Sequence, residues 1–250
     1  MKKGIIIQAR LGSSRLPHKV LLPIVNELNL LQLVINRLRL LAIPIVVATT
    51  DEAIDDELVA YLENRKISYY RGSEYNVLER FIGAAEESGF DSVIRVCADN
   101  PLLDIPYLNM LVKLWDENPN VDYLSYSYKS KPTILTHFGV FAECVSLNAL
   151  RKVSMFQLSD QRYIEHVTYG VYSNPSVFNV KLIDITDEIL LYDGIRLTVD
   201  TESDYLHIRE VYNKLTVDPL LLDFREVAEW IRNQPILFNS MKNSIIINKK

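Results

Sequence analysis

The chain has 250 residues, of which 48% are hydrophobic, and a formal net charge of −5 at pH 7. This size and composition provide for a substantial core, and the acidic balance argues against a broad nucleic-acid surface. We expect no membrane partner either, because no apolar run approaches the about 20 residues of a membrane helix. The spacing of Cys97 and Cys144 suits neither a metal site nor a redox pair, which favours reduced thiols and a cytoplasmic protein.

In the first half of the chain, short β-type runs alternate with segments of helical period. The expected strands are 4–7, 43–48, 67–70 and 92–97, and the expected helices are 30–41, 55–65 and 76–88. This alternation predicts right-handed βαβ units, and therefore an α/β fold with a mainly parallel sheet flanked by helices. Ligands bind beyond the carboxyl ends of such strands, so the loops at Arg10, 49–51 and Asp99 should converge on one cleft.

The alternation weakens after residue 121. A Tyr-rich, mixed stretch at about 122–180 predicts an α+β insertion that binds the acceptor or mediates a dimer contact. A strand is expected at 195–199, followed by helices at 202–215 and 224–232. Without an internal repeat or linker, residues 1–235 are predicted to be a single domain and 236–250 a flexible tail.

The segment 8–19, directly after the first strand, combines small residues with cations. Gly12 and the two serines after it let backbone N–H groups approach an anion, while Arg10, Arg15 and Lys19 add charge. The segment contains neither the Walker pattern Gly-x-x-x-x-Gly-Lys nor the dinucleotide pattern Gly-x-Gly-x-x-Gly. It predicts a phosphate-binding loop, and a solvated basic turn is the alternative.

Two aspartates follow apolar runs that lie far apart in the sequence. Asp99 comes just past the strand expected at 92–97, and Asp200 just past the one at 195–199. Two such carboxylates can hold Mg²⁺ while phosphates and water complete its shell. The alternative is that each aspartate caps the helix or turn that follows it. With the phosphate loop, the pair indicates phosphoryl or nucleotidyl transfer, a reaction that requires neutralised phosphate charge.

Five runs in order along the chain resemble the cytidylyltransferases, and together they extend over most of it. They are residues 7–10, 12–19, 71–74, 95–102 and 196–201. The resemblance is strongest to the spore-coat polysaccharide biosynthesis protein F-like branch, and it is broader to the CMP-sialic acid and CMP-KDO synthetases.

The resemblance implies a Rossmann-like nucleotidyltransferase fold that transfers CMP from CTP to an acceptor, releases pyrophosphate and uses Mg²⁺ as cofactor. The implied acceptor is an acidic sugar, a 3-deoxy-2-ulosonic acid of the sialic or octulosonic type, in surface-glycan precursor synthesis. The implied assembly is a homodimer. The implied catalytic residues are Arg10, Arg15 and Lys19, and the implied metal ligands are Asp99 and Asp200. The implied nucleotide-binding residues are Gln8, Ala9, Arg10, Gly12, Ser13, Ser14, Arg15, Lys19, Arg71, Gly72 and Ser73.

The nucleoside-facing role implied for 71–73 has a structural alternative, since a tight strand-to-helix turn would use Gly72 and Ser73 in the same way.

On the acceptor side, the residues implied by the resemblance are Glu143, Glu165 and His166. His166 can position or deprotonate the attacking hydroxyl, and a buried structural histidine bonded to Glu143 or Glu165 is the alternative. The chain also departs from the common branch pattern at His18, Phe141 and Ile164. They stand where the branch often has glycine, an acidic residue and arginine, respectively. Arg151 or Arg162 is a candidate to supply the lost positive charge.

Two rival functions stay open. One is a nucleotidyltransferase that uses another nucleoside triphosphate or a phosphorylated small-molecule acceptor. The other is a non-catalytic nucleotide-binding module, against which the pair Asp99 and Asp200 argues.

Overall fold

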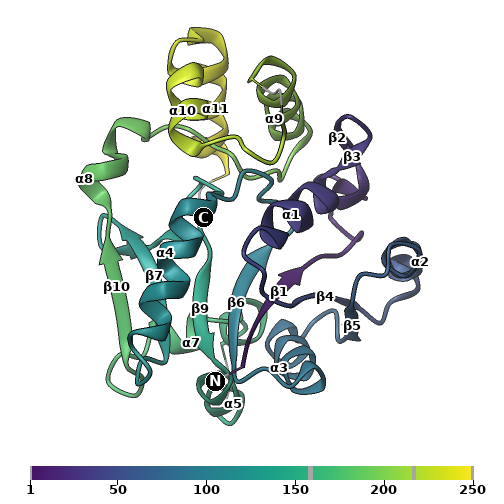
Figure 1. Cartoon of the computed structure of the whole chain (residues 1–250), viewed down its shortest axis with the longest axis vertical. Helices are drawn as coiled ribbons and strands as arrows, with labels where there is room; N and C mark the ends of the chain where they lie inside the picture. Colours follow the sequence, from purple (N-terminus) through teal and green to yellow (C-terminus); the bar gives the residue numbers. More distant parts are fainter. Residues whose placement is uncertain (1, 157–159, 216–217, 249–250) are drawn as a thin grey trace.

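The computed structural model describes residues 2–156, 160–215 and 218–248, which form a mixed sheet with helices on both faces (Figure 1). The strand order is β10-β7-β9-β6-β1-β4-β5, and β8 pairs with β7. The strands are β1 (Lys3–Gln8), β4 (Ile45–Thr50), β5 (Tyr69–Gly72), β6 (Ser92–Cys97), β7 (Tyr123–Tyr128), β8 (Lys131–Pro132), β9 (Glu143–Ser146) and β10 (Val180–Asp184). A separate small sheet pairs β2 (Pro23–Val25) with β3 (Leu28–Asn29).

The first half of the chain forms parallel βαβ units. β1 pairs in parallel with β4 and with β6, and β4 pairs in parallel with β5. The connecting helices are α1 (Leu30–Arg39), α2 (Asp56–Asn64) and α3 (Val77–Ser88). The predicted α/β fold with a mainly parallel sheet is therefore confirmed.

Part of the region predicted as an insertion continues the main sheet. β9 is antiparallel to β6 on one side and to β7 on the other, and β10 extends the sheet in parallel with β7. The rest of this region forms helices: α5 (Leu147–Ser154), α6 (Arg162–Glu165) and α7 (Tyr169–Tyr172).

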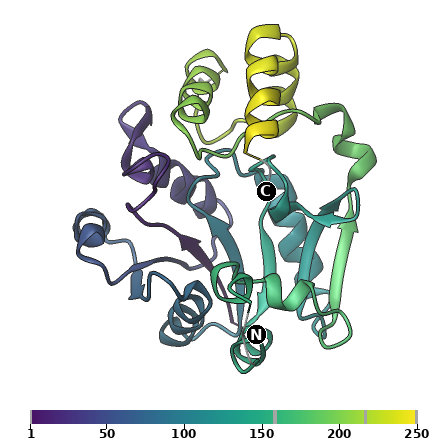
Figure 2. The same cartoon turned by 180° about the vertical axis from the view of Figure 1, so that it is seen from behind.

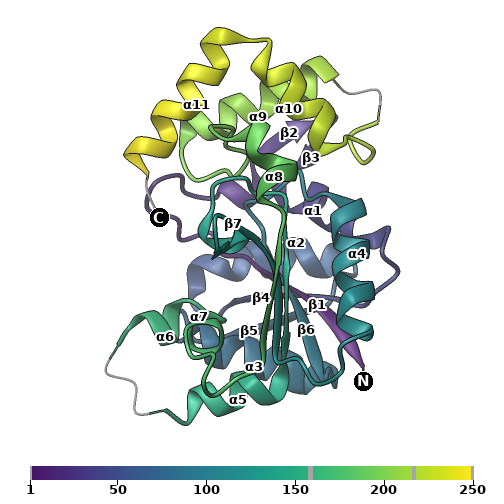
Figure 3. The same ribbon diagram turned by 90° about the vertical axis from the view of Figure 1, so that its left-hand side faces the viewer.

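The two faces of the sheet bury different side chains because successive residues of a strand point to opposite sides. Ile5 and Ile7 of β1 pack in the cluster that includes α1, α2 and α4 (Ile105–Asp116), whereas Ile6 packs in the cluster with α3, α5 and α7. In Figure 3, α4 lies on one side of the sheet and α6 and α7 lie on the other. Burial on both faces accounts for the continuous apolar run of this strand.

The prediction of a strand at 195–199 was wrong, because this buried segment joins no sheet in the part of the chain that the structure describes. The Leu197 N–H donates to the carbonyl of His137 at 3.3 Å. Gly139, at φ 70°, lies against this segment, and a Cβ there would come within 2.7 Å of the Thr198 nitrogen. The apolar run was therefore buried by loop packing, which hydrophobicity alone does not distinguish from strand pairing.

The prediction of a flexible tail at 236–250 was also wrong for the described residues, which form the helix α11 (Pro235–Ile247). Leu237 and Met241, four residues apart on one helical face, are buried, and α11 contacts α9 (Glu202–Leu215) and α10 (Phe224–Arg232). Pro235 is compatible with a first helical turn, where a backbone donor is not needed. Figures 1 and 2 show α9, α10 and α11 together at the end of the molecule opposite the N-terminus.

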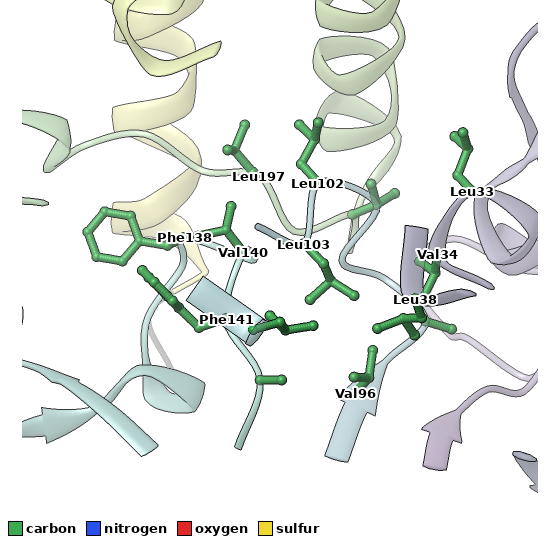
Figure 4. Close-up of a cluster of buried hydrophobic side chains, with 14 of the residues drawn as sticks. Leu33, Val34, Leu38, Val96, Leu102, Leu103, Phe138, Val140, Phe141 and Leu197 are labelled. Carbon is green, nitrogen blue, oxygen red and sulfur yellow. The ribbon is translucent and has the colours of Figure 1, made fainter. Parts of the chain in front are cut away.

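The loop that carries Asp99 is anchored in the core by the leucines that follow it. Leu102 and Leu103 are almost completely buried. Figure 4 shows both between side chains of α1, such as Leu38, and the side chains of Phe138 and Phe141. This packing fixes the loop after β6 relative to α1.

The remaining short helices lie in loops. They are η1 (Lys19–Leu21), η2 (Ala53–Asp55), η3 (Thr133–Leu135), α8 (Thr186–Ile189) and η4 (Leu190–Tyr192). Within the described ranges, every helix is too short or too polar to span a membrane.

Candidate active site

The predicted phosphate loop has a fixed shape because it folds around Leu11, which is completely buried. The Leu11 N–H donates to Oδ1 of Asp55 at 2.6 Å. The Leu11 carbonyl accepts from the N–H groups of Ser13 at 2.8 Å and His18 at 3.0 Å. Asp55, which sequence reasoning used only as a helix start, is a buried anchor of this loop. Its partner is 44 residues away, so no local pattern could have revealed it.

His18 adopts the left-handed conformation, at φ 57°. Glycine adopts this conformation readily, which gives a backbone reason for the glycine that the branch often has there. The His18 Nδ1 atom lies 3.2 Å from Oε2 of Glu57, and its side chain is 45% exposed. The side chain therefore lies at the surface, on α2.

A cavity of about 230 Å³ opens beyond the carboxyl ends of β1 and β6. It brings together most of the residues implied for the nucleotide and one implied metal ligand. Its lining is Gln8, Ala9, Arg10, Ser13, Ser14, Arg15, Lys19, Val20, Cys97, Ala98 and Asp99.

Lys19 contacts both of the aspartates that lie far apart in the sequence. Its Nζ lies 3.1 Å from Oδ2 of Asp99 and 3.3 Å from Oδ1 of Asp200. It also donates to the carbonyl of Val199 at 2.7 Å, and the Val199 N–H donates to the carbonyl of Asp99 at 2.8 Å. The segment 195–199 thus runs beside the loop after β6, although it is not a strand. The convergence of the loop cations on both aspartates, expected from the sequence, is present in the fold.

The charge of Lys19 is stabilised by these two acids. Burial alone would lower the pKa of Lys19, but the carboxylates of Asp99 and Asp200 outweigh it and raise the pKa above its ordinary value. Lys19 is therefore a permanent cation at neutral pH, as the binding of a phosphate requires.

The Asp200 carboxylate contacts two arginines in addition to Lys19. Oδ2 accepts from Nη2 of Arg196 at 2.7 Å, and Oδ1 lies 3.2 Å from Nη2 of Arg15. Arg196 is itself held by Asp204, whose Oδ1 accepts from its Nε at 2.8 Å. Asp204 also accepts from the backbone N–H groups of Asp200 and Thr201. The carboxylate that serves this helix start is therefore Asp204, which leaves the Asp200 side chain directed at the cations.

The capping alternative for Asp99 has a similar outcome, because the cap of α4 is Asp104, which accepts from the Tyr107 N–H at 2.8 Å. Burial raises the pKa of Asp104.

The donors around Lys19 fit Mg²⁺. Carboxylate oxygens are the ligands that this ion prefers, and it usually binds through one or two carboxylates together with substrate phosphates. Asp99 and Asp200 face one ammonium group, so they can face one cation. Across residues 2–156, 160–215 and 218–248, no cluster of three or more His, Cys, Asp and Glu side chains could hold a metal without other ligands. A site formed here would thus need oxygens from phosphate and water.

The loop implied to face the nucleoside is held by hydrogen bonds and an ion pair of Arg71. The Arg71 guanidinium donates to the carbonyls of Thr50 and Glu52, at 3.0 Å each, and pairs with Asp56 at 2.7 Å. Ser73 Oγ accepts from the Asn76 N–H at 3.0 Å, as a tight turn before α3 requires. The turn geometry is therefore present, and the contact with a nucleoside stays a prediction.

The implied acceptor residues lie in two different environments. Glu143, on β9, is 1% exposed and pairs with Nη1 of Arg95 at 2.7 Å. It also accepts from the hydroxyls of Thr168 and Tyr123. Arg95 Nη2 donates to Oε1 of Gln8 at 3.2 Å, and Gln8 lines the cavity. Glu143 is thus connected to the cavity through Arg95 rather than exposed in it.

Glu165 and His166 lie at the exposed end of α6, so a buried structural histidine is not what the structure contains. The two arginines considered as replacement charges pair with local acids instead. Arg162 lies 2.7 Å from Asp160, and Arg151 lies 2.8 Å from Glu86. Phe141 is buried among aromatic side chains of the core.

A larger cavity, of about 330 Å³, lies between α4, β10 and α10. Asp104 and Asp223 in its wall are helix caps, and it contains none of the implied nucleotide or metal residues. The smaller, charged cavity is therefore the candidate active site.

Comparison with known families agrees with this geometry. Residues 4–219 match the family model described as cytidylyltransferase. The chain belongs to the cytidylyltransferase family. The match includes both aspartates and every residue implied for the nucleotide.

Individual relatives of this cytidylyltransferase support the same assignment. It is 32% identical over 216 residues to the spore coat polysaccharide biosynthesis protein SpsF of Bacillus subtilis, which covers 84% of this chain and 85% of the relative. A cytidylyltransferase structure from Leptospira borgpetersenii serovar Hardjo-bovis superposes with a TM-score of 0.82 at 28% identity, covering 95% and 97% of the two chains. The CTP complex of CMP:2-keto-3-deoxy-manno-octonic acid synthetase shares the fold, with a TM-score of 0.65 at 16% identity over 86% and 100%.

The candidate active site of this cytidylyltransferase also contacts a helix that lies beyond the matched residues. Arg15 Nη1 donates to Oδ1 of Asn248, at the end of α11, at 3.2 Å. The C-terminal helix therefore contributes to the surroundings of the candidate active site.

Proposed function

We propose that this cytidylyltransferase transfers CMP from CTP to a hydroxyl of an acidic sugar and releases pyrophosphate, with Mg²⁺ as cofactor. The observation that carries the proposal is Lys19, which contacts both Asp99 and Asp200 beside a cavity lined by Arg10 and Arg15. A 3-deoxy-2-ulosonic acid of the sialic or octulosonic type is the proposed acceptor, and surface-glycan precursor synthesis is the proposed role. The name of the SpsF relative, which refers to polysaccharide biosynthesis, supports that role.

In the proposed reaction, the acceptor oxygen forms a bond to the α-phosphorus of CTP as the bond to the pyrophosphate oxygen breaks. Arg10, Arg15 and Lys19 bind the triphosphate and stabilise the charge that develops on the leaving pyrophosphate. Asp99 and Asp200 would hold Mg²⁺, which when bound neutralises phosphate charge. No protein nucleophile takes part.

The proposed acceptor site lies on the side of β9. Gln8 and Arg95 connect the cavity to the buried Glu143, which fixes the direction of these two side chains. Glu165 and His166 are proposed to contact the acceptor from the exposed end of α6, where His166 can take the proton of the attacking hydroxyl.

We also propose a homodimer that acts in the cytoplasm. Cys97 and Cys144 are thiols rather than a disulfide, which suits a reducing compartment. β10 lies at one end of the strand order, and its Leu182 is 38% exposed, which favours an association at this edge.

The test measures pyrophosphate release with CTP, UTP, ATP and GTP against a panel of acidic and phosphorylated sugars. We expect activity with CTP and an acidic sugar, and a loss of about 100-fold or more in Asp99→Asn and Asp200→Asn, as for removal of a group that stabilises transition-state charge. Asp187→Asn, an exposed carboxylate of α8, is the matched control.

Each outcome of this panel discriminates between the functions. Turnover confined to UTP or GTP would exclude the cytidylyl transfer. Binding of nucleotide without any turnover would favour a non-catalytic module, and full activity of both variants would refute the metal role of the aspartates.

A further inference from the structure

The cavity cation Arg10 is already paired with an acid of this chain. Its Nη1 lies 2.9 Å from Oε1 of Glu74, in the turn between β5 and α3, and the two side chains are 43% and 27% exposed. A phosphate that binds Arg10 must share or replace this carboxylate. The displaced carboxylate would then lie close to a highly charged triphosphate unless another cation accepted it.

Arg80 is a second cation next to the same turn. It lies on α3, is 1% exposed, and donates from Nη1 to the carbonyl of Ser73 at 2.5 Å. Its Nε and Nη2 atoms are buried without a hydrogen-bond partner among the residues that the structure describes. Buried donors that lack an acceptor are costly, so this arrangement is unusual unless another state of the protein satisfies them.

The lowered pKa of Arg80 also indicates that its guanidinium lacks a carboxylate partner. Burial and the positive charge of Arg10 lower the pKa of Arg80 to about 10, in spite of Asp55, Asp51 and Glu74 nearby. A carboxylate placed at the unpartnered donors would therefore stabilise the charged guanidinium.

We propose that Glu74 and Arg80 are a positioning pair for the triphosphate. In the empty site the Glu74 carboxylate pairs with Arg10, and when phosphate binds Arg10 the carboxylate turns to the unpartnered N–H groups of Arg80. This inference rests on the proposed use of a nucleoside triphosphate.

Glu74 and Arg80 are in contact before any movement of the Glu74 side chain. The Glu74 carbonyl lies 3.5 Å from Nη1 of Arg80, so the backbone of Glu74 is already beside the guanidinium. Glutamate has three rotatable side-chain bonds, and staggered rotamers interchange without movement of the backbone. The pair would thus free Arg10 for phosphate and satisfy the buried donors in one step.

A purely structural role for Arg80 makes a different prediction. If Arg80 only held the carbonyl of Ser73, its replacement would disturb the turn whether or not residue 74 carried a charge. In the proposed pair, the effect of replacing Arg80 depends on the Glu74 carboxylate. A double-mutant cycle separates the two roles.

The experiment measures the dissociation constant of CTP with Mg²⁺ by titration calorimetry for wild type, Glu74→Gln, Arg80→Met and the double variant. We expect Glu74→Gln to tighten CTP binding several-fold in the Arg80→Met background, where the displaced carboxylate has no partner, and to change it much less when Arg80 is present. Arg80→Met should bind about tenfold more weakly in the presence of Glu74 and within about twofold of its parent in the Glu74→Gln background, a coupling typical of residues in contact. Arg80→Lys, which retains the charge, should recover most of the affinity.

Glu79→Gln is the matched control, because it removes the same charge from an exposed position of α3. An equal effect of Arg80→Met in both backgrounds would overturn the positioning pair. If Arg80→Met fails to fold, Arg80→Gln, which retains a donor for the Ser73 carbonyl, takes its place in the cycle. A wild-type protein that binds none of the four nucleoside triphosphates would refute the proposed function itself, and if it binds another one, the cycle is run with that nucleotide.

Discussion

At the scale of single residues, the site is built from side chains whose partners are far away in the sequence. Asp55 holds Leu11, and Asp204 and Arg196 together orient Asp200. The Asp200 carboxylate and the phosphate loop are thereby correctly directed before any ligand binds. Such preorganisation lowers the cost of stabilising charge during the reaction.

Glu143→Gln should destabilise the protein strongly. Glu143 and Arg95 form a buried ion pair, and removal of one partner leaves an uncompensated buried charge at a cost of about 3–5 kcal/mol. Glu165→Gln, at an exposed position, should change the stability by less than about 0.5 kcal/mol. Urea denaturation of both variants measures the difference. Equal stability of Glu143→Gln and wild type would show that Glu143 is not held in this way.

Sequence reasoning located the ligand-facing charges but not the residues that orient them. Arg15, Lys19 and Asp99 follow recognisable strands, and the carboxyl ends of parallel strands meet at one edge. Arg80 lies inside a helix whose apolar pattern gives no sign that it contacts the turn before it. The burial of Glu143 could not be predicted either, because it depends on Arg95 and Thr168 from other elements.

At the scale of elements, the alternation of strands and helices was predictable, and the end of the chain was not. Most helices of the first half begin and end within two residues of the predicted positions because their apolar faces pack on the sheet. The apolar residues of α11 do not recur with a clear helical period, so the helix could not be predicted from the sequence. Its packing on α9 and α10 stabilises it. The expected strand at 195–199 failed for the converse reason, since its apolar residues are buried by loops.

The contact between α9 and α11 should weaken in mild acid. His207 Nε2 lies 3.0 Å from Oγ of Ser240, and burial lowers the pKa of His207 below 6.5, although Asp204 and Glu210 act in the opposite direction. Between the lowered pKa and 6.5 the unfolded chain binds more protons than the folded one, so stability is greatest above pH 6.5 and falls as the pH falls through this range.

Thermal denaturation between pH 7.5 and 5 tests this expectation. In His207→Gln the fall in melting temperature over this range should be smaller than in wild type. His166→Gln, which changes an exposed histidine, should keep the wild-type dependence. An identical pH dependence of all three proteins would refute a role for His207.

At the scale of the whole molecule, the candidate site is formed by parts that the sheet and the C-terminal helices hold together. Lys19 follows β1, Asp99 follows β6, Asp200 precedes α9, and Arg15 contacts the end of α11. A ligand that binds all of these groups links the N-terminal and C-terminal parts of the chain. Its binding free energy should therefore stabilise the entire fold rather than one loop.

CTP with Mg²⁺ should raise the melting temperature for this reason. A ligand at about 100 times its dissociation constant adds about 2.7 kcal/mol to the stability of the state that binds it. For a chain of this size that corresponds to a rise of about 5–10 °C. Differential scanning fluorimetry should show a smaller rise for UTP and GTP, and a smaller rise for CTP when EDTA removes the metal. Asp99→Asn should lose the part that depends on Mg²⁺, because the ion then has only Asp200 to bind it. A rise that is the same for every nucleotide, with or without the metal, would instead indicate general anion binding by Arg10, Arg15 and Lys19.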